Sequence, residues 1–144
     1  RIDFTEIEVL DFYSGSGSLG LECLSRGAKH VTFIERDFKI YKNLLENIKS
    51  LNVEDNCKVI KISAIDYSKK NPYKQYDLIL ADPPFFKDDI YEVVKNIIQN
   101  NYLKSDARMV IERSIQTKGK DIENFKTEPF KIIGDSCLYE ILQK

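Results

Sequence analysis

The chain has almost no excess of charge of either sign. Its 144 residues include 22 lysines and arginines and 23 aspartates and glutamates, which leaves a formal net charge of −1. Domains that bind nucleic acid through the phosphate backbone usually carry clustered positive charge. The balance therefore argues against a large nucleic-acid footprint on this segment alone.

Residues that build metal and disulfide sites are also scarce. Cys23, Cys57 and Cys137 are odd in number and form no Cys-x-x-Cys pair, and His30 is the only histidine. Without ligand spacing, scattered cysteines indicate buried thiols in a reducing compartment. We expect no metal site, and we expect a structural role for His30 at the start of a strand.

Long apolar runs and signal-peptide patterns are missing as well. We therefore expect a cytoplasmic protein with no membrane partner, and we expect it to be a monomer. With 42% hydrophobic residues, a chain of this size can bury one core, so we expect residues 1–144 to form a single domain.

Strand-like apolar segments alternate with helical patterns along the chain. Such alternation implies an α/β fold, with a mostly parallel sheet, helices on both faces and a closing antiparallel strand pair in the tail. In the second helix, Leu44, Leu45, Ile48 and Leu51 recur on one face, so we expect them in the core. The expected strands are 9–12, 31–35, 58–62, 78–81, 109–112, 130–133 and 138–142, and the expected helices are 18–26, 38–51 and one marked by apolar residues in 90–98.

A glycine-rich turn joins the first strand to the first helix. Gly15, Gly17 and Gly20 form a Gly-x-Gly-x-x-Gly pattern, which allows a tight turn and a close approach of ligand to backbone beside a helix N-terminus. Glu35 ends the next strand, where a carboxylate is placed to bind a ribose diol. By themselves, these features fit NAD as well as S-adenosylmethionine.

A proline loop follows the fourth strand, with the sequence Asp82-Pro83-Pro84-Phe85. Consecutive prolines have a fixed φ and donate no backbone hydrogen bond, so the loop is stiff and its carbonyls are free to accept. A carboxylate, a free carbonyl and an aromatic face together suit a flat ring that bears an exocyclic amine. The alternative interpretation is a rigid loop whose Phe85 belongs to the core.

Together, these motifs resemble the bacterial 16S ribosomal RNA guanine-N2 methyltransferases of the RsmD type. The segments that carry the resemblance are DFYSGSGSLGLE at 11–22, IERD at 34–37 and DLILADPPF at 77–85, in the family's order and spacing. The resemblance covers essentially the whole chain. It implies a Rossmann-like class I methyltransferase with a seven-stranded sheet, which transfers a methyl group from S-adenosylmethionine to N2 of a guanine in small-subunit ribosomal RNA.

The resemblance also implies the site residues. It assigns catalysis to Asp82, Pro83, Pro84 and Phe85, while Asp66, outside the site, is expected to be a helix N-cap. The residues implied to bind the cofactor are Asp11, Ser14, Gly15, Ser16, Gly17, Gly20, Glu35, Arg36, Ser63, Ala64 and Ile65, of which the last three would frame the adenine.

The expected substrate is ribosomal RNA within a small-subunit ribonucleoprotein particle. The resembled family carries a basic N-terminal segment that includes an arm implicated in RNA binding, and we expect that segment to be absent from residues 1–144. Other interpretations stay open at this point. A DNA adenine-N6 or protein glutamine-N5 methyltransferase uses a similar loop, an NAD-dependent dehydrogenase shares the glycine turn, and a binding module without catalysis is a further possibility.

Overall fold

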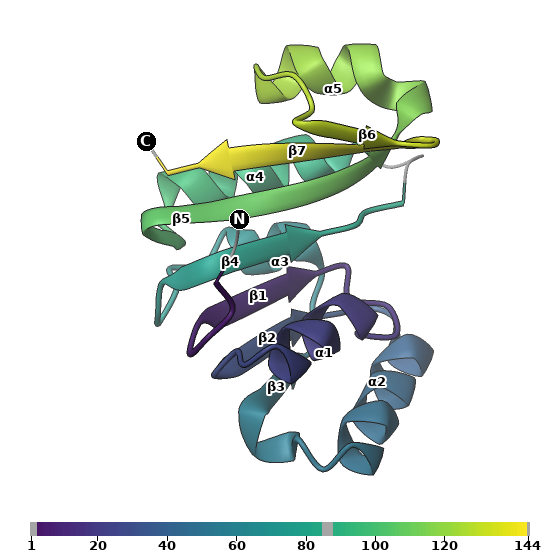
Figure 1. The fold of residues 1–144 in the computed structure, drawn as a ribbon, viewed down its shortest axis with the longest axis vertical. Helices are drawn as coiled ribbons and strands as arrows, with labels where there is room; N and C mark the ends of the chain where they lie inside the picture. The colour runs from purple at the N-terminus through teal and green to yellow at the C-terminus, as the bar shows by residue number, and fades with distance from the viewer. Residues whose placement is uncertain (1–2, 85–87, 144) are drawn as a thin grey trace.

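The computed structural model describes residues 3–84 and 88–143. Its centre is a twisted sheet with helices on both faces (Figure 1). The sheet has seven strands in the order β3-β2-β1-β4-β5-β7-β6. The strands are β1 (Glu8–Phe12), β2 (His30–Ile34), β3 (Cys57–Ile60), β4 (Tyr76–Ala81), β5 (Leu103–Ser114), β6 (Lys131–Ile133) and β7 (Ser136–Leu142).

The sheet is parallel from β3 to β5 and antiparallel beyond it. β7 lies antiparallel to both β5 and β6, so the predicted α/β class, the seven strands and the closing antiparallel pair are confirmed. The helices are α1 (Ser18–Ser25), α2 (Phe38–Ser50), α3 (Ala64–Ser68), α4 (Asp89–Gln99) and α5 (Lys118–Phe125), with 3₁₀ turns η1 (Glu54–Asn56) and η2 (Ile115–Thr117).

Apolar side chains are buried on both faces of the sheet. On one face, α1 and α2 pack over β1 and β2, where Phe33 and Leu44 are fully buried. On the other face, α3, α4 and α5 cover the sheet, and Phe12 and Ile79 are fully buried. Alternation along each strand sends neighbouring side chains to opposite faces, which explains how short strands supply both cores.

The order in which successive strands are added to the sheet changes direction between β1 and β4. From β1 it proceeds outward to β2 and β3, and then returns to place β4 on the other side of β1. Ligands of open α/β sheets bind beyond the carboxyl ends of the strands at such a point. The carboxyl ends of β1, β2 and β4 therefore define where the site should be sought.

α5 is an element that the sequence did not predict. It is joined to the end of β5 by a buried ion pair in which Arg113 Nε lies 3.0 Å from Asp121 Oδ2. Thr117 Oγ1 donates to the same carboxylate at 2.6 Å, and the Tyr91 hydroxyl of α4 also donates to it. A satisfied carboxylate thus connects three elements through polar contacts, which apolar periodicity cannot indicate.

Two local expectations were wrong. Ser63, rather than Asp66, is the N-cap of α3, because the Ser63 hydroxyl accepts from the Asp66 backbone N–H at 3.1 Å. In α2, Leu44 and Ile48 are buried as predicted, but Leu45 and Leu51 are 40% and 57% exposed. The contact face of α2 is therefore narrower than the apolar pattern suggests.

Candidate active site

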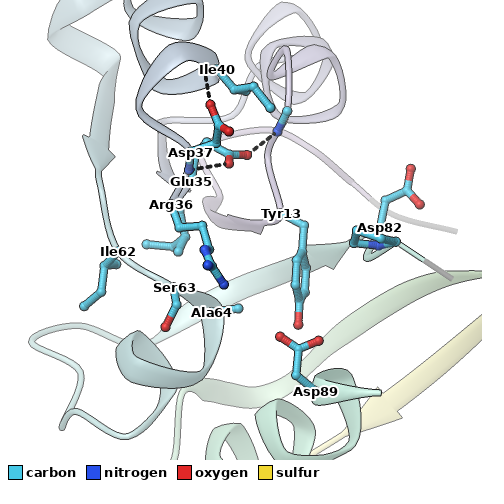
Figure 2. A pocket seen from close by; sticks show the side chains of 13 residues that line it. Tyr13, Glu35, Arg36, Asp37, Ile40, Ile62, Ser63, Ala64, Asp82 and Asp89 are labelled. Carbon is cyan, nitrogen blue, oxygen red and sulfur yellow. Dashed lines mark hydrogen bonds between the residues drawn. The ribbon is translucent and has the colours of Figure 1, made fainter. Parts of the chain in front are cut away.

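A cavity of about 440 Å³ opens at the carboxyl ends of β1, β2 and β4. Its size falls in the range of small-molecule sites. Figure 2 shows that its labelled side chains come from the segments after β1 and β2, the start of α3, the loop after β4 and the start of α4. The residues that line it are Tyr13, Gly15, Ile34, Glu35, Arg36, Asp37, Ile40, Ile62, Ser63, Ala64, Asp82, Pro84 and Asp89.

The glycine turn forms one wall of this cavity. Gly15 has a φ of 55°, and a Cβ built there would have no heavy atom within 4 Å, so the backbone is open to a ligand. Gly20 is different, since a Cβ there would lie 2.4 Å from Phe33 Cε1. Its role is close packing of α1 against β2. Gly17 likewise lies against Leu44.

Asp11 lies beneath the turn, and its side chain is almost completely buried. Its Oδ2 accepts from the Gly20 backbone N–H at 3.2 Å. Burial raises the pKa of Asp11 well above its usual range, and the nearby charges of Asp82 and Glu35 raise it further. Asp11 thus supports the turn from behind the cavity wall.

Neither serine of the turn, Ser14 or Ser16, lines the cavity. Ser14 Oγ donates to the Asp11 carbonyl at 2.6 Å and accepts from the Ile34 backbone N–H at 3.1 Å. These bonds fasten the ends of β1 and β2 together. Ser16 is exposed, and its carbonyl accepts from the Asn47 side chain at 3.3 Å.

Glu35 is placed by the turn that it faces. Its Oε1 accepts from the Gly15 backbone N–H at 3.0 Å and its Oε2 accepts from the Asp37 backbone N–H at 3.0 Å (Figure 2). A carboxylate offers about four acceptor positions. Glu35 therefore keeps acceptor capacity for a ligand diol, while its orientation is already set.

An apolar slot extends from Glu35 toward α3. Ile34, Ile40 and Ile62 line it, with Ser63 and Ala64 at the start of α3. Arg36 is exposed and also lines this part. Of the predicted adenine-framing residues, Ser63 and Ala64 line the cavity, whereas Ile65 packs against the core on the α3 side.

The proline loop closes the opposite end. Asp82 is exposed and lines the cavity, Pro83 is buried and Pro84 is exposed. Partial desolvation of the Asp82 carboxyl raises its pKa, and the negative charge of Glu112 raises it further. Phe85, the fourth predicted catalytic residue, lies outside the described residues.

Tyr13 and Asp89 line the cavity, although the sequence did not point to them. Tyr13 has a φ of 58°, and its hydroxyl points toward Asp89 (Figure 2). Burial raises the pKa of Tyr13, and the charge of Asp89 adds to the effect. Tyr13 looked like the last apolar residue of a strand and Asp89 like the start of a helix, so neither carried a separate signal.

A second cavity of about 430 Å³ opens on the other side of the proline loop. It shares Asp82 and Pro84 with the first cavity, so one carboxylate borders both spaces. The other residues that line it are Pro83, Glu112, Arg113, Ser114, Asp135 and Ser136. This arrangement can hold two ligands that meet at Asp82.

In residues 3–84 and 88–143, no group of three or more His, Cys, Asp or Glu side chains could hold a metal ion. Across the same ranges, no helix is both long and apolar enough to cross a bilayer.

A family model described as "Conserved hypothetical protein 95" matches residues 2–141. Ribosomal RNA small subunit methyltransferase D of Haemophilus influenzae is 38% identical over 108 residues, which are 73% of this chain and 55% of that relative. The chain thus spans about half the length of this relative.

Solved structures show the same fold. A putative methylase from Haemophilus influenzae has a TM-score of 0.77 at 30% identity, covering 97% of this chain and 89% of that one. A putative methyltransferase from Escherichia coli has a TM-score of 0.80 at 26% identity, covering 95% of this chain and 78% of that one.

Proposed function

Since the chain belongs to the conserved hypothetical protein 95 family, we propose that it transfers a methyl group from S-adenosylmethionine to N2 of a guanine in 16S ribosomal RNA. The observation that carries the proposal is the position of Asp82, which borders both a cofactor-sized cavity and a second cavity beside the proline loop. A relative named as a small-subunit ribosomal RNA methyltransferase supports the substrate class.

The residues around the first cavity fit S-adenosylmethionine. Gly15 leaves the backbone open to the methionine end, Glu35 has acceptor capacity for the ribose, and the slot before Ser63 and Ala64 is apolar enough for the adenine. When bound, S-adenosylmethionine supplies the electrophilic methyl group, and transfer leaves S-adenosylhomocysteine, the methylated base and a proton. The carboxylates of Glu35 and Asp82, which line the cavity, suit a cationic ligand.

Asp82 is proposed to act on the amine. An exocyclic amine is a poor nucleophile because its lone pair is delocalised into the ring. Hydrogen-bond acceptors at the Asp82 carboxylate and the Pro83 carbonyl would favour a tetrahedral nitrogen and stabilise the positive charge that develops on it. The stiff prolines hold both acceptors in place, and fixed orientation of this kind lowers the barrier by several kcal/mol.

Proton loss is proposed to follow methyl transfer. Asp82 is an acid whose usual pKa is about 3.9, so it is a weak base at neutral pH, although partial desolvation and the charge of Glu112 raise that pKa. Once the nitrogen carries the methyl group and a positive charge, its proton is acidic enough to leave to Asp82 or to water.

The partner is proposed to be a small-subunit ribonucleoprotein particle rather than free RNA. A net charge of −1 provides little of the phosphate neutralisation that drives binding to naked nucleic acid. The target base must be unstacked to reach the loop, which a single-stranded ribosomal region allows. We also propose that the protein is a monomer and that it acts in the cytoplasm, where this substrate occurs.

Labelled methyl transfer tests this function. Small ribosomal subunits from a strain that lacks the enzyme should accept label from S-adenosylmethionine, and digestion should place it in N2-methylguanosine. Label in N6-methyladenosine of DNA or in a glutamine side chain would instead support the other amino-methyltransferase classes. Thermal stabilisation by NAD but not by S-adenosylmethionine would support a dehydrogenase and overturn the proposal.

A further inference from the structure

Two carboxylates, those of Asp82 and Glu112, line the second cavity. In the parallel register, Ala81 of β4 pairs with Ile111 of β5. Asp82, the first residue after β4, therefore lies beside Glu112, which is near the carboxyl end of β5. Both line the cavity, and Glu112 is close enough for its charge to raise the pKa of Asp82.

Glu112 is held in position by the neighbouring strand. The Ser136 hydroxyl of β7 donates to Glu112 Oε2 at 3.1 Å. This bond uses one of the roughly four acceptor positions of the carboxylate, so Glu112 keeps acceptor capacity for a ligand in the cavity. Glu112 is half-buried, which strengthens any hydrogen bond that it accepts there.

Arg113, the basic residue that lines this cavity, forms its ion pair with Asp121 of α5. Arg113 is 2% exposed, and its Nε bonds both oxygens of Asp121, at 3.2 and 3.0 Å. Neighbouring side chains of a strand point to opposite faces of the sheet. Arg113 therefore points to the face that α5 covers, and Glu112 points to the other face. The face beside the proline loop is therefore an acceptor surface.

Few nucleobase edges suit two adjacent acceptors. Guanine places a ring N1–H donor directly beside its exocyclic amine. In adenine and cytosine, the ring nitrogen beside the amine is an acceptor, which a carboxylate repels. A carboxylamide side chain has an amine but no adjoining ring donor. An acceptor next to the amine-binding carboxylate thus distinguishes guanine from the substrates of the other amino-methyltransferase classes.

We propose that Glu112 is a specificity residue that accepts the N1–H of the target guanine while Asp82 accepts from its N2 amine. The inference rests on the proposed function and assigns the base-reading contact within it. The two donors on this edge of guanine would also offset the repulsion between the negative charges of Asp82 and Glu112.

Replacement of the target base by 2-aminopurine tests this contact. This base keeps the 2-amino group but has a ring N1 acceptor in place of the N1–H donor. The substrate is a small subunit reconstituted with 2-aminopurine at the guanine that the labelling experiment identifies. The native protein should prefer guanine by roughly a hundredfold in kcat/KM, because unmatched polar groups in a site are strongly discriminated against.

Glu112→Gln should narrow that preference by about tenfold or more, because the amide can donate to the ring N1 of 2-aminopurine. Cofactor affinity and melting temperature should stay unchanged. Ser136→Ala, which frees Glu112 Oε2, should shift the ratio in the same direction to a smaller extent. Glu140→Gln is the matched control, since Glu140 bonds Arg108 on the same strand pair at 2.7 Å, away from this cavity.

The outcomes separate the two proposals. A native protein that methylates guanine while Glu112→Gln and Ser136→Ala keep the native ratio would overturn the role of Glu112 alone. A native protein that is inert on the guanine particle would overturn the proposed function, and the role of Glu112 with it. If Glu112→Gln fails to fold, an unchanged ratio in Ser136→Ala still counts against the proposal.

Discussion

At the residue scale, Glu35 connects the cavity to the glycine turn. Its carboxylate accepts from Gly15 and Asp37, so the side chain that is proposed to bind the ribose also shapes the loop that is proposed to meet the methionine end. Ligand affinity and loop geometry should therefore depend on the same carboxylate.

Replacement of Glu35 should weaken cofactor binding. Glu35→Ala should reduce S-adenosylmethionine affinity by roughly 1–3 kcal/mol, the scale for hydrogen bonds to a charged group. Glu35→Gln, which retains one carbonyl oxygen, should fall between the alanine variant and the native protein. Calorimetry provides the measurement, with exposed Glu46→Ala on α2 as the control. Equal affinity in all four proteins would remove Glu35 from the site.

Asp11 makes stability depend on pH. Its folded-state pKa is raised, chiefly by burial, so the folded protein binds a proton that the unfolded chain releases at lower pH. Stability must then fall as pH rises from the unfolded pKa through the folded one. Asp11→Asn keeps an acceptor for Gly20 and lacks this titration. Denaturant unfolding between about pH 4 and pH 8 should show that the free energy of unfolding of the variant increases relative to that of the native protein as pH rises. Parallel stability curves would contradict the raised pKa.

The sequence predicted site residues where a strand-end rule applied. That rule pointed to Asp11, Glu35 and Asp82, because polar residues at the ends of parallel strands meet at one edge. Glu35 and Asp82 line the cavity, whereas Asp11 lies behind its wall. Glu112 ends an apolar run in the same way and could have been found by the same rule. Tyr13 and Asp89 could not, because their approach to each other depends on the backbone turn after β1 and on where α4 begins.

At the element scale, the packing of α1 on β2 holds the glycine turn in place. Gly20 lies so close to Phe33 that an added Cβ would be 2.4 and 2.9 Å from two ring carbons. The third glycine of the motif therefore acts on the helix rather than on a ligand.

Gly20→Ala should destabilise the protein by roughly 1–3 kcal/mol, the usual range for overpacking. Gly119→Ala is the matched comparison, because a Cβ there meets nothing within 4 Å in the first turn of α5. The second substitution should be neutral or stabilising by about 0.5–1 kcal/mol, since alanine favours helix. Denaturant unfolding measures both. A Gly20→Ala variant as stable as Gly119→Ala would show that α1 is not packed as described.

The elements that the sequence predicted are those with apolar periodicity. The strands of the parallel sheet and helices α1, α2 and α4 carry it, and all of them are present. α5 begins Lys118-Gly119-Lys120 and is held by the buried contact of Asp121 with Arg113, which no local pattern indicates. β5 runs from Leu103 to Ser114, well beyond the apolar stretch that marked it, because pairing with β4 and β7 extends it.

At the scale of the whole molecule, charge limits what the chain can bind unaided. Acidic and basic residues nearly balance, and some of the basic ones are engaged in pairs such as Lys120 with Asp88 and Arg108 with Glu140. A surface of this kind has little net attraction for phosphates. Recognition of a ribosomal target would have to come from the shape of the site and from contacts supplied by an assembled particle.

Methyl transfer should therefore depend on how the RNA is presented. Assembled small subunits should be better substrates than the same RNA free of proteins, and a longer protein with a basic N-terminal segment should exceed residues 1–144. Binding of residues 1–144 to free RNA should be weak and only slightly dependent on salt, because few counterions are released. Equal rates on particles, short naked RNA and duplex DNA would contradict this account.

Asp82 is proposed to act on the amine and not on the cofactor, and the kinetics of Asp82→Ala distinguish these two roles. The variant should bind S-adenosylmethionine with nearly native affinity but lose roughly 10²- to 10⁴-fold in kcat, because its contact strengthens in the transition state. Asp88→Ala, which removes a nearby exposed carboxylate paired with Lys120, should retain native turnover. Full turnover by Asp82→Ala on small subunits would contradict the account.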